Sequence, residues 1–257
     1  MINRKTNSEI ELMKKSSDIL VNALIRLKEA VKPGITTLEL DKIAEQYIRK
    51  NGAIPSFLGY KSPYRGAIDY PGSICASVNN EVVHGIPGLR ALKDGDIISI
   101  DIGVYINGFH SDAARTFPVG NISQQAQDLI DATKQSFYEG IKNAVVGKRI
   151  CDISTSIQEY IEGKGYSIVR DYVGHGIGRD MHEDPQIPNY KFRGANPRLE
   201  QGMALAIEPM VNAGSYNVKL LENKWTVVTL DNSLSAHYEN TIIVTDDEPV
   251  ILTGTPE

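Results

Sequence analysis

An internal similarity between the two halves of the chain constrains its fold more than any other sequence feature. Five residues of the first half match five of the second at a constant offset of 113: Gly34, Leu40, Tyr47, Ile48 and Gly52 correspond to Gly147, Ile153, Tyr160, Ile161 and Gly165. A second match, at an offset of 107, relates Leu92-Lys93-Asp94-Gly95 and the following Asp101 to Leu199-Glu200-Gln201-Gly202 and the following Glu208. The period is too long for a solenoid. We therefore predict a single α+β domain over residues 1–257, with pseudo-repeats at about 31–120 and 146–245, each a helix followed by antiparallel strands that carry acidic residues.

Four helices are predicted from apolar periodicity and from residues that favour helix starts. Two of them begin with capping-box patterns, Ser8 with Glu11 and Thr36 with Glu39. The predicted helical ranges are about 8–32, 36–51, 123–146 and 152–163. Strands are predicted around 74–78, 97–102, 226–230 and 236–244.

A predicted hairpin places two carboxylates side by side. Asn107-Gly108 is a strong signal for a two-residue hairpin loop. If these residues form the loop, Asp101 lies opposite Ala114, and Asp112 is its diagonal neighbour on the same face, at about 7–8 Å. The isoleucines around Asp101 argue against a carboxylate that simply faces water, because a buried carboxylate needs a partner. A divalent cation is the simplest partner for this pair.

Three further side chains complete a set suited to metal binding. His175 lies in Gly174-His175-Gly176-Ile177-Gly178, where the glycines allow close backbone approach. Glu208 ends a strand-like stretch in the second half, and Glu239 lies in the strand-like stretch near the end of the chain. Four carboxylates and one imidazole are a ligand set for two hard or borderline divalent cations. Such a pair of ions predicts metal-assisted hydrolysis.

The overall composition excludes several other classes. The net charge is −5 and the basic residues are scattered, so no nucleic-acid-binding patch is expected, and any ribosome contact needs a local patch. Two cysteines fit a reducing compartment and cannot form a four-ligand structural zinc site. No stretch approaches the roughly 20 apolar residues of a membrane helix, and no apolar signal core is present. Cytoplasmic residence is the expectation.

The remaining histidines have a structural role as their default interpretation. His84 and His182 each precede a proline by three residues, and taken alone each is expected to be a hydrogen-bonded structural histidine. His110 shares the sheet face of Asp112, and His237 that of Glu239, so each is a candidate to support a metal ligand from behind.

Several segments of the chain resemble the signature segments of type I methionine aminopeptidases, in family order and over nearly the whole length. They are Asn80-Glu81-Val82-Val83-His84-Gly85-Ile86-Pro87, Asp101-Ile102-Gly103 with Gly108-Phe109 and Asp112, Gly174-His175-Gly176-Ile177-Gly178, Ile207-Glu208-Pro209-Met210 and Ser235-Ala236-His237-Tyr238-Glu239-Asn240-Thr241. The resemblance implies a pita-bread fold with a central dimetal site. It also implies removal of the initiator methionine from nascent proteins whose second residue is small.

The same matching implies roles for individual residues. Its five metal ligands map onto Asp101, Asp112, His175, Glu208 and Glu239, with Asp112 and Glu239 bridging two ions that activate a water or hydroxide. Glu208 would also move a proton to the leaving amine, and His84 and His182 become substrate-contacting catalytic histidines. By family position the methionine pocket is formed by Tyr70, Cys75, Tyr172, Met181 and Trp225.

Three departures from the family pattern accompany the resemblance. Ser111 stands where many relatives have glycine, Met181 stands where an aromatic residue is common, and the loop at residues 61–69 is longer than in many relatives. None of these changes removes a ligand. The loop leaves the pocket lining near Tyr70 open.

Two other functions remain as alternatives. An Xaa-Pro aminopeptidase-like enzyme would share the fold and the ligands, although such relatives usually carry a sizeable N-terminal domain. A noncatalytic pita-bread binding protein would typically lose ligands, and all five are present. The implied cofactors are two divalent metal ions, with Mn, Fe, Co and Zn all acceptable to such a site. The expected partners are the N-terminal methionine of nascent chains and, transiently, the ribosome, and the chain is expected to act as a monomer.

Overall fold

The computed structural model describes residues 2–255, which form two helix pairs around a group of antiparallel sheets. The helices are α1 (Asn7–Ala30), α2 (Thr37–Lys50), α3 (Gln124–Ile141) and α4 (Ile150–Gly163). The strands are β1 (Ile54–Pro55), β2 (Ile74–Val78), β3 (Glu81–Val83), β4 (Ile97–Ile106), β5 (Phe109–Pro118), β6 (Ser167–Ile168), β7 (Gly174–Gly176), β8 (Glu183–Ile187), β9 (Ala204–Ile207), β10 (Met210–Asn212), β11 (Val218–Leu220), β12 (Val227–Thr229), β13 (Ser235–His237), β14 (Asn240–Ile243) and β15 (Val250–Ile251). None of the helices within residues 2–255 is both long and apolar enough to cross a membrane.

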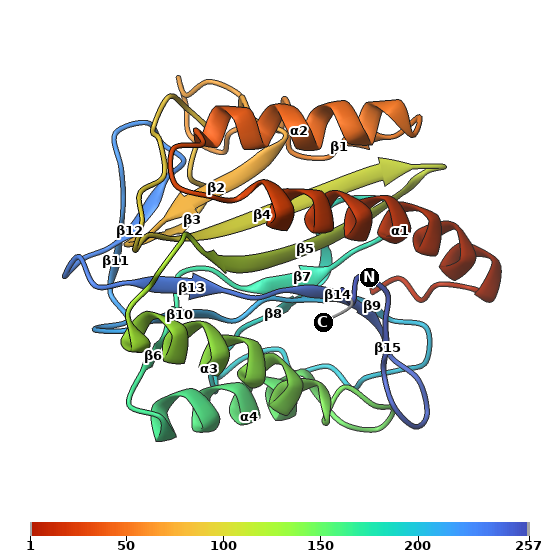
Figure 1. Cartoon of the computed structure of the whole chain (residues 1–257). Helices are drawn as coiled ribbons and strands as arrows, with labels where there is room; N and C mark the ends of the chain where they lie inside the picture. Colours follow the sequence, from red (N-terminus) through yellow and green to blue (C-terminus); the bar gives the residue numbers. More distant parts are fainter. Residues whose placement is uncertain (1, 256–257) are drawn as a thin grey trace.

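The helices cover opposite sides of the strands. In Figure 1, α2 lies above the sheet that contains β2, β4 and β5 and α1 crosses over its strands, whereas α3 and α4 lie below the strands of the second half. The first sheet has the order β1-β4-β2, with β5 also paired to β4. The largest sheet of the second half has the order β15-β14-β9-β7-β8. The strands are thus enclosed between the two helix pairs.

The alternation along β4 explains how one strand serves both a core and a site. Ile98, Ile100 and Ile102 are fully buried against apolar residues of α1 and α2. Ser99 and Asp101 therefore lie on the opposite face, as the period of two predicts. A second apolar core fills the space between the other sheet and α3 and α4.

The two halves share local hydrogen bonds at the offsets seen in the sequence. The Gly34 amide donates to the Leu92 carbonyl at 2.8 Å, and the Gly147 amide donates to the Leu199 carbonyl at 3.1 Å. Isolated β-bridges recur in the same way, joining Thr36 to Ala91 in one half and Arg149 to Arg198 in the other. Each loop before α2 or α4 is thus tied to the segment that leads into β4, which carries Asp101, or into β9, which Glu208 follows. The two pseudo-repeats therefore share the same local hydrogen bonds and β-bridges.

Several predicted element boundaries need correction. Helix α1 begins earlier than predicted, because Thr6 and Glu9 form its capping box in place of Ser8 and Glu11. Helix α4 begins at Ile150 and not at Asp152, whose carboxylate instead accepts the Arg149 amide at 2.8 Å.

Two other segments end or break where tertiary contacts compete with local structure. Helix α3 ends at Ile141, five residues before the predicted end: the Asn143 and Ala144 amides donate three residues back, and the Val146 amide donates to the Thr245 carbonyl. The predicted strand at 236–244 is two strands, β13 and β14, interrupted at Tyr238 and Glu239. The prediction for α2 is confirmed at its Thr36 and Glu39 capping box.

Candidate metal centre and active site

The β4–β5 hairpin holds the first two carboxylates in the predicted register. Asp101 pairs with Ala114, and Gly103 pairs with Asp112. The loop residues Asn107 and Gly108 have φ values of 55° and 84°, as a type I′ turn requires. Both carboxylates project from the sheet face turned away from α1 and α2. The hairpin prediction is therefore confirmed.

Close backbone packing brings His175 to the same place. It lies on β7 between β8 and β9, where a side chain at Gly174 would meet the Ala206 carbonyl oxygen at 2.4 Å and one at Gly176 would meet the Asp184 carbonyl oxygen at 2.2 Å. Only glycine leaves room for strands this close. The glycines around His175 therefore allow the tight packing that the sequence suggested.

The imidazole of His175 presents one free nitrogen to the carboxylates. Its Nδ1 atom lies 2.8 Å from the Gly176 carbonyl oxygen, which can only accept, so Nδ1 carries the proton. Its Nε2 atom lies 3.8 Å from Asp112 Oδ2 and 3.7 Å from Glu208 Oε1. The nitrogen that faces the acids therefore has a lone pair available for a metal.

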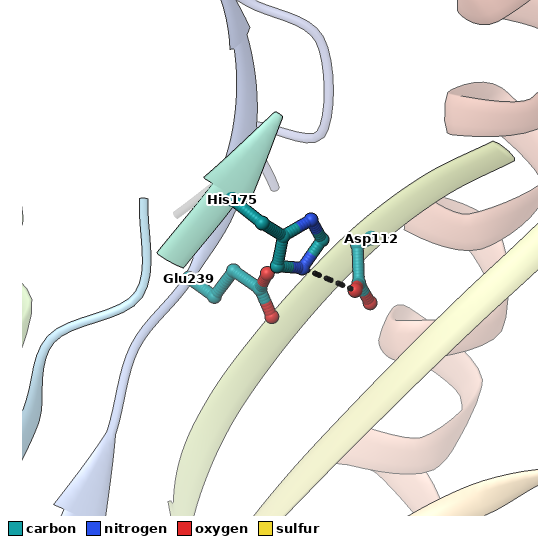
Figure 2. Close-up of side chains that lie close together, drawn as sticks. All are labelled: Asp112, His175 and Glu239. Atoms are coloured by element: carbon teal, nitrogen blue, oxygen red, sulfur yellow. Dashed lines mark ion pairs between the residues drawn. The ribbon is translucent and has the colours of Figure 1, made fainter. Parts of the chain in front are cut away.

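Breaks in strand structure place the two glutamates. Glu208 follows the last residue of β9, and Glu239 lies between β13 and β14, where its amide donates to the Ala114 carbonyl at 3.0 Å. Ligand atoms of Asp112, His175 and Glu239 all lie within 4.8 Å of one another. Figure 2 shows these three side chains pointing toward one another from three different strands or strand ends.

Three buried carboxylate oxygens lack a hydrogen-bond partner among residues 2–255. They are Asp101 Oδ1, Asp112 Oδ1 and Glu239 Oε1. Burial raises the pKa of Asp101 to about 7 and that of Glu208 to about 8. Burial, and then the neighbouring acids, hold the pKa values of Asp112 and Glu239 well above their usual range.

The donor set fits divalent cations. Burial lowers the pKa of His175 to about 3, so this imidazole is neutral and ready to bind a metal. Oxygen donors with one imidazole suit hard or borderline divalent ions, and such ions would compensate the unpartnered oxygens. The residues present therefore fit the metal ions that the sequence predicted.

A cavity of about 240 Å³ opens onto the five acidic and imidazole side chains. Its lining includes Tyr70, Cys75, Tyr172 and Trp225 from the predicted pocket, together with His84 and His182. Met181 is not among the lining residues. Its side chain is buried in the apolar cluster behind them, where its Cε atom would lie 3.1 Å from a Cβ added at Gly103. Met181 therefore backs the pocket without lining it.

Sequence reasoning missed several residues that line the cavity. These are Phe57, Tyr60, Pro63, Val83, Val173 and Met210. Val83 and Val173 are direct neighbours of the site residues His84 and Tyr172, which was a usable signal. Met210 is two residues from Glu208 and could have been found in the same way. Phe57, Tyr60 and Pro63 lie in or just before the 61–69 loop, whose path periodicity does not define.

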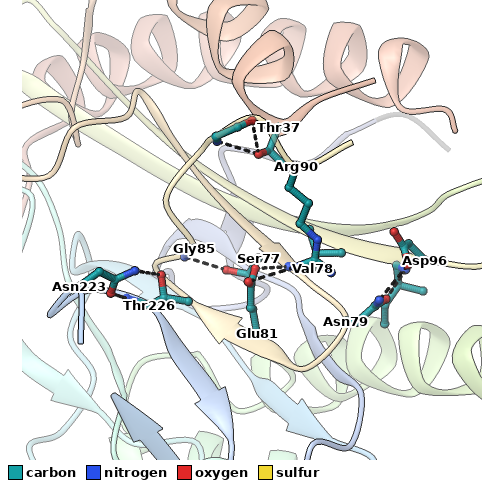
Figure 3. Close-up of polar contacts among 12 residues, drawn as sticks. Thr37, Ser77, Val78, Asn79, Glu81, Gly85, Arg90, Asp96, Asn223 and Thr226 are labelled. Atoms are coloured by element: carbon teal, nitrogen blue, oxygen red, sulfur yellow. Dashed lines mark hydrogen bonds and ion pairs between the residues drawn. The ribbon is translucent and has the colours of Figure 1, made fainter. Parts of the chain in front are cut away.

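Backbone contacts fix His84 in an uncommon conformation. Its φ is 58°, in the left-handed region that few non-glycine residues adopt. The Thr226 hydroxyl donates to its carbonyl at 3.3 Å, and the next amide, that of Gly85, donates to Ser77 Oγ at 3.1 Å. Figure 3 shows the bond between Gly85 and Ser77, with Asn223 bound to Thr226 on one side and Glu81 bound to the Val78 amide on the other. The backbone of His84 therefore has the structural role expected from the sequence, but its ring lines the cavity and can contact a substrate.

The other histidines differ in their surroundings. His182 Nδ1 lies 2.6 Å from the Tyr60 hydroxyl oxygen, and its ring centre is 4.3 Å from that of His175. His237 Nε2 lies 3.6 Å from Glu208 Oε2, so it faces a different carboxylate from the one expected. His110 Nδ1 lies 2.9 Å from Ser56 Oγ, and its ring packs on Tyr105. The contacts of His110 are therefore with Ser56 and Tyr105, and its support of Asp112 stays a prediction.

Comparisons with known proteins match this geometry. Residues 11–246 match the model of metallopeptidase family M24. The methionine aminopeptidase of Clostridium perfringens is 58% identical, over 98% of this chain and 99% of that protein. The crystal structure of methionine aminopeptidase from Rickettsia prowazekii is 39% identical and superposes with a TM-score of 0.94, covering 99% of this chain and 100% of that one.

A more distant likeness concerns the fold alone. The Xaa-Pro dipeptidase of Bacillus anthracis is 24% identical, with a TM-score of 0.76, and covers 99% of this chain but 62% of that one. The pita-bread architecture expected from the sequence is confirmed by these shared folds. The chain therefore belongs to metallopeptidase family M24 and is one of its methionine aminopeptidases.

Proposed function

We propose that this metallopeptidase removes the initiator methionine from nascent proteins whose second residue is small, using two divalent ions drawn from Mn, Fe, Co and Zn. The main support is the meeting of Asp101, Asp112, His175, Glu208 and Glu239 at one cavity. Buried oxygens of three of these acids have no partner within the described residues. Buried acids must be neutralised either by protons or by a bound cation, and divalent ions would supply the charge that this cluster lacks.

In this proposal the five side chains divide between two ions. Asp112 and Glu239 would contact both, Asp101 would complete one site, and His175 with Glu208 would complete the other. When bound, the ions lower the pKa of an attacking water and polarise the scissile carbonyl. The orientation of His175, with Nδ1 held by the Gly176 carbonyl, supports its part in this division.

Three residues of the chain handle protons and the developing negative charge. Glu208 would accept the proton that the attacking water gives up and pass it to the leaving amine. His182 donates a hydrogen bond to the substrate carbonyl oxygen as it becomes tetrahedral. His84 holds the attacked peptide at the cavity, where its ring meets Tyr172 and Trp225 edge-on.

The methionine side chain occupies the apolar part of the cavity. Tyr70, Cys75, Tyr172 and Trp225 supply its walls, and Met181 supports them from behind. Nascent chains are made in the cytoplasm, so the enzyme would act there. We expect it to act as a monomer and to contact the ribosome transiently.

The decisive experiment compares substrates and metals. A chelated sample should be inactive and should regain release of methionine from Met-Ala-Ser when a divalent ion is returned. Glu208→Ala should stay inactive, whereas Glu200→Ala, which changes an exposed glutamate, should match the unaltered enzyme. Cleavage of an Xaa-Pro peptide in place of Met-Ala-Ser would overturn the substrate assignment. Metal binding without cleavage of either peptide would favour the noncatalytic alternative.

A further inference from the structure

The turn that carries His182 is built around a buried carboxylate. It connects β7 to β8 and ends at Glu183, whose Oε1 atom accepts the amides of Arg179 at 2.8 Å and Asp180 at 3.3 Å. The other oxygen, Oε2, accepts Lys5 Nζ at 2.6 Å. Glu183 therefore holds the turn from inside and ties it to a residue 178 positions away in the chain.

This ion pair is far more buried than its neighbours. The side chains of Lys5 and Glu183 are 4% and 6% exposed, whereas those of the adjacent pair Arg4 and Glu200 are 61% and 54% exposed. Removing two charges from water costs several kcal/mol per ion, so a buried pair is a poor device for stability alone. The pair does hold the turn in one position relative to Lys5, because neither side chain can move without leaving the other charge unpaired.

The surrounding backbone closes tightly on the pair. A Cβ added at Gly178 would lie 2.3 Å from Lys5 Cε and 2.7 Å from Glu183 Oε1. The Lys5 amide also donates to the Gly202 carbonyl at 2.6 Å, and Arg4 forms a β-bridge with Met203, just before β9. Lys5 is thus anchored to the segment that leads to Glu208. The ion pair links that anchor to the turn of His182.

We propose that Lys5 and Glu183 are positioning residues for His182, which keep its imidazole at the cavity where Tyr60 contacts it. The inference rests on the proposed function, in which His182 hydrogen-bonds the substrate carbonyl as charge develops. Because that bond forms mainly in the transition state, its misplacement lowers kcat and leaves KM nearly unchanged.

Neutral variants separate positioning from stability. Lys5→Met and Glu183→Gln each leave one buried charge unpaired and should lower the melting temperature. The double variant Lys5→Met with Glu183→Gln removes both charges, and its glutamine still offers an oxygen to the Arg179 and Asp180 amides. It should melt close to the unaltered protein and still show a kcat about tenfold to a hundredfold lower. The single conservative variant Lys5→Arg keeps a cation opposite Glu183, so its kcat should lie much closer to that of the unaltered enzyme than the kcat of the double variant. Arg4→Met should leave kcat unchanged.

A mutant cycle that includes His182→Ala tests whether the ion pair affects kcat through His182. Once His182→Ala has removed the imidazole, adding the double variant should lower kcat no further. A folded double variant with unaltered kcat would overturn the proposal, and so would a full additional loss in the His182→Ala background.

A measurement without catalysis keeps the two proposals apart. In the metal-free protein labelled with ¹⁵N-histidine, the ring signals of His182 should shift or broaden in the double variant and stay unchanged in Arg4→Met. If the unaltered enzyme fails to release methionine, the proposed function fails while this spectrum still tests the positioning. If the enzyme is active and the His182 signals do not change, the positioning proposal fails alone.

Discussion

Arg115 holds the backbone carbonyl of Glu239, whose side chain lines the cavity. The guanidinium donates to the backbone carbonyl of Glu239, to Asn240 Oδ1 at 2.7 Å and to the Thr253 carbonyl at 3.0 Å. It also lies 4.3 Å from the ring centre of Tyr238. The buried guanidinium of Arg115 therefore holds the backbone between β13 and β14 in place, where the side chain of Glu239 projects toward the cavity.

We expect Arg115→Met to destabilise the metal-free protein by about 3–5 kcal/mol, because it leaves several buried acceptors unpaired. Urea unfolding measures this change. Arg26→Met is the control, since Arg26 stacks on Tyr47 at an exposed position and its loss should cost less than about 1 kcal/mol. Equal effects of the two changes would contradict the role given to Arg115.

Metal affinity should rise with pH between about 6 and 8. Burial raises the pKa of Asp101 to about 7 and that of Glu208 to about 8, so the metal-free site holds protons that an incoming ion must displace. Calorimetric titration with Mn²⁺ in buffers of different ionisation enthalpy counts those protons, and at least one should be released at pH 7. An affinity that stays constant over this range would contradict the prediction.

The raised pKa values of Asp101 and Glu208 also make the stability of the metal-free protein depend on pH. Their ordinary pKa values are 3.8 for Asp101 and 4.5 for Glu208, so the folded state binds protons more tightly than the unfolded state. Their contribution to the free energy of unfolding is therefore complete below about pH 4 and is lost as the pH rises through about 7–8. Melting curves of chelated protein should show this contribution falling across that window, and added Mn²⁺ should offset the loss most at the alkaline end.

Gly174→Ala should weaken both folding and metal binding. The added Cβ would lie 2.4 Å from the Ala206 carbonyl oxygen, so β7 and His175 must shift, at a cost of about 1–3 kcal/mol or more. Gly163→Ala is a matched control, because Gly163 ends α4 with nothing within 4 Å of an added Cβ. That control should stabilise the protein by about 0.5–1 kcal/mol in urea unfolding. A destabilised Gly163→Ala, or an unaffected Gly174→Ala, would contradict the packing argument.

Trp225 should report the filling of the pocket. It is the only tryptophan of the chain, it lines the cavity and its Nε1 donates to the Ile68 carbonyl at 3.0 Å. Methionine added to the zinc-supplied enzyme should shift the emission of Trp225, and lysine at the same concentration should leave it unchanged. Trp225→Phe removes the signal and serves as the blank. An identical response to both amino acids would place the methionine side chain elsewhere.

The sequence by itself determined the parts of the site that local geometry controls. The period of two along β4 and the φ requirement at Asn107-Gly108 left one register for Asp101 and Asp112, and that register is the one observed. The offsets of 113 and 107 likewise predicted matching halves, because each half repeats the same glycine turn and the same bridge to the strand that follows.

Only the tertiary structure decided what distant segments do to one another. The sequence did not predict that Lys5 reaches Glu183, that Met181 lies behind the pocket, or that Arg115 holds the loop of Glu239. These contacts join residues far apart in the chain, and no local periodicity or turn preference specifies which buried group meets which. Neighbouring residues set strand register and helix starts, whereas the packing of two helix pairs around the sheets brings the buried carboxylates together at one cavity.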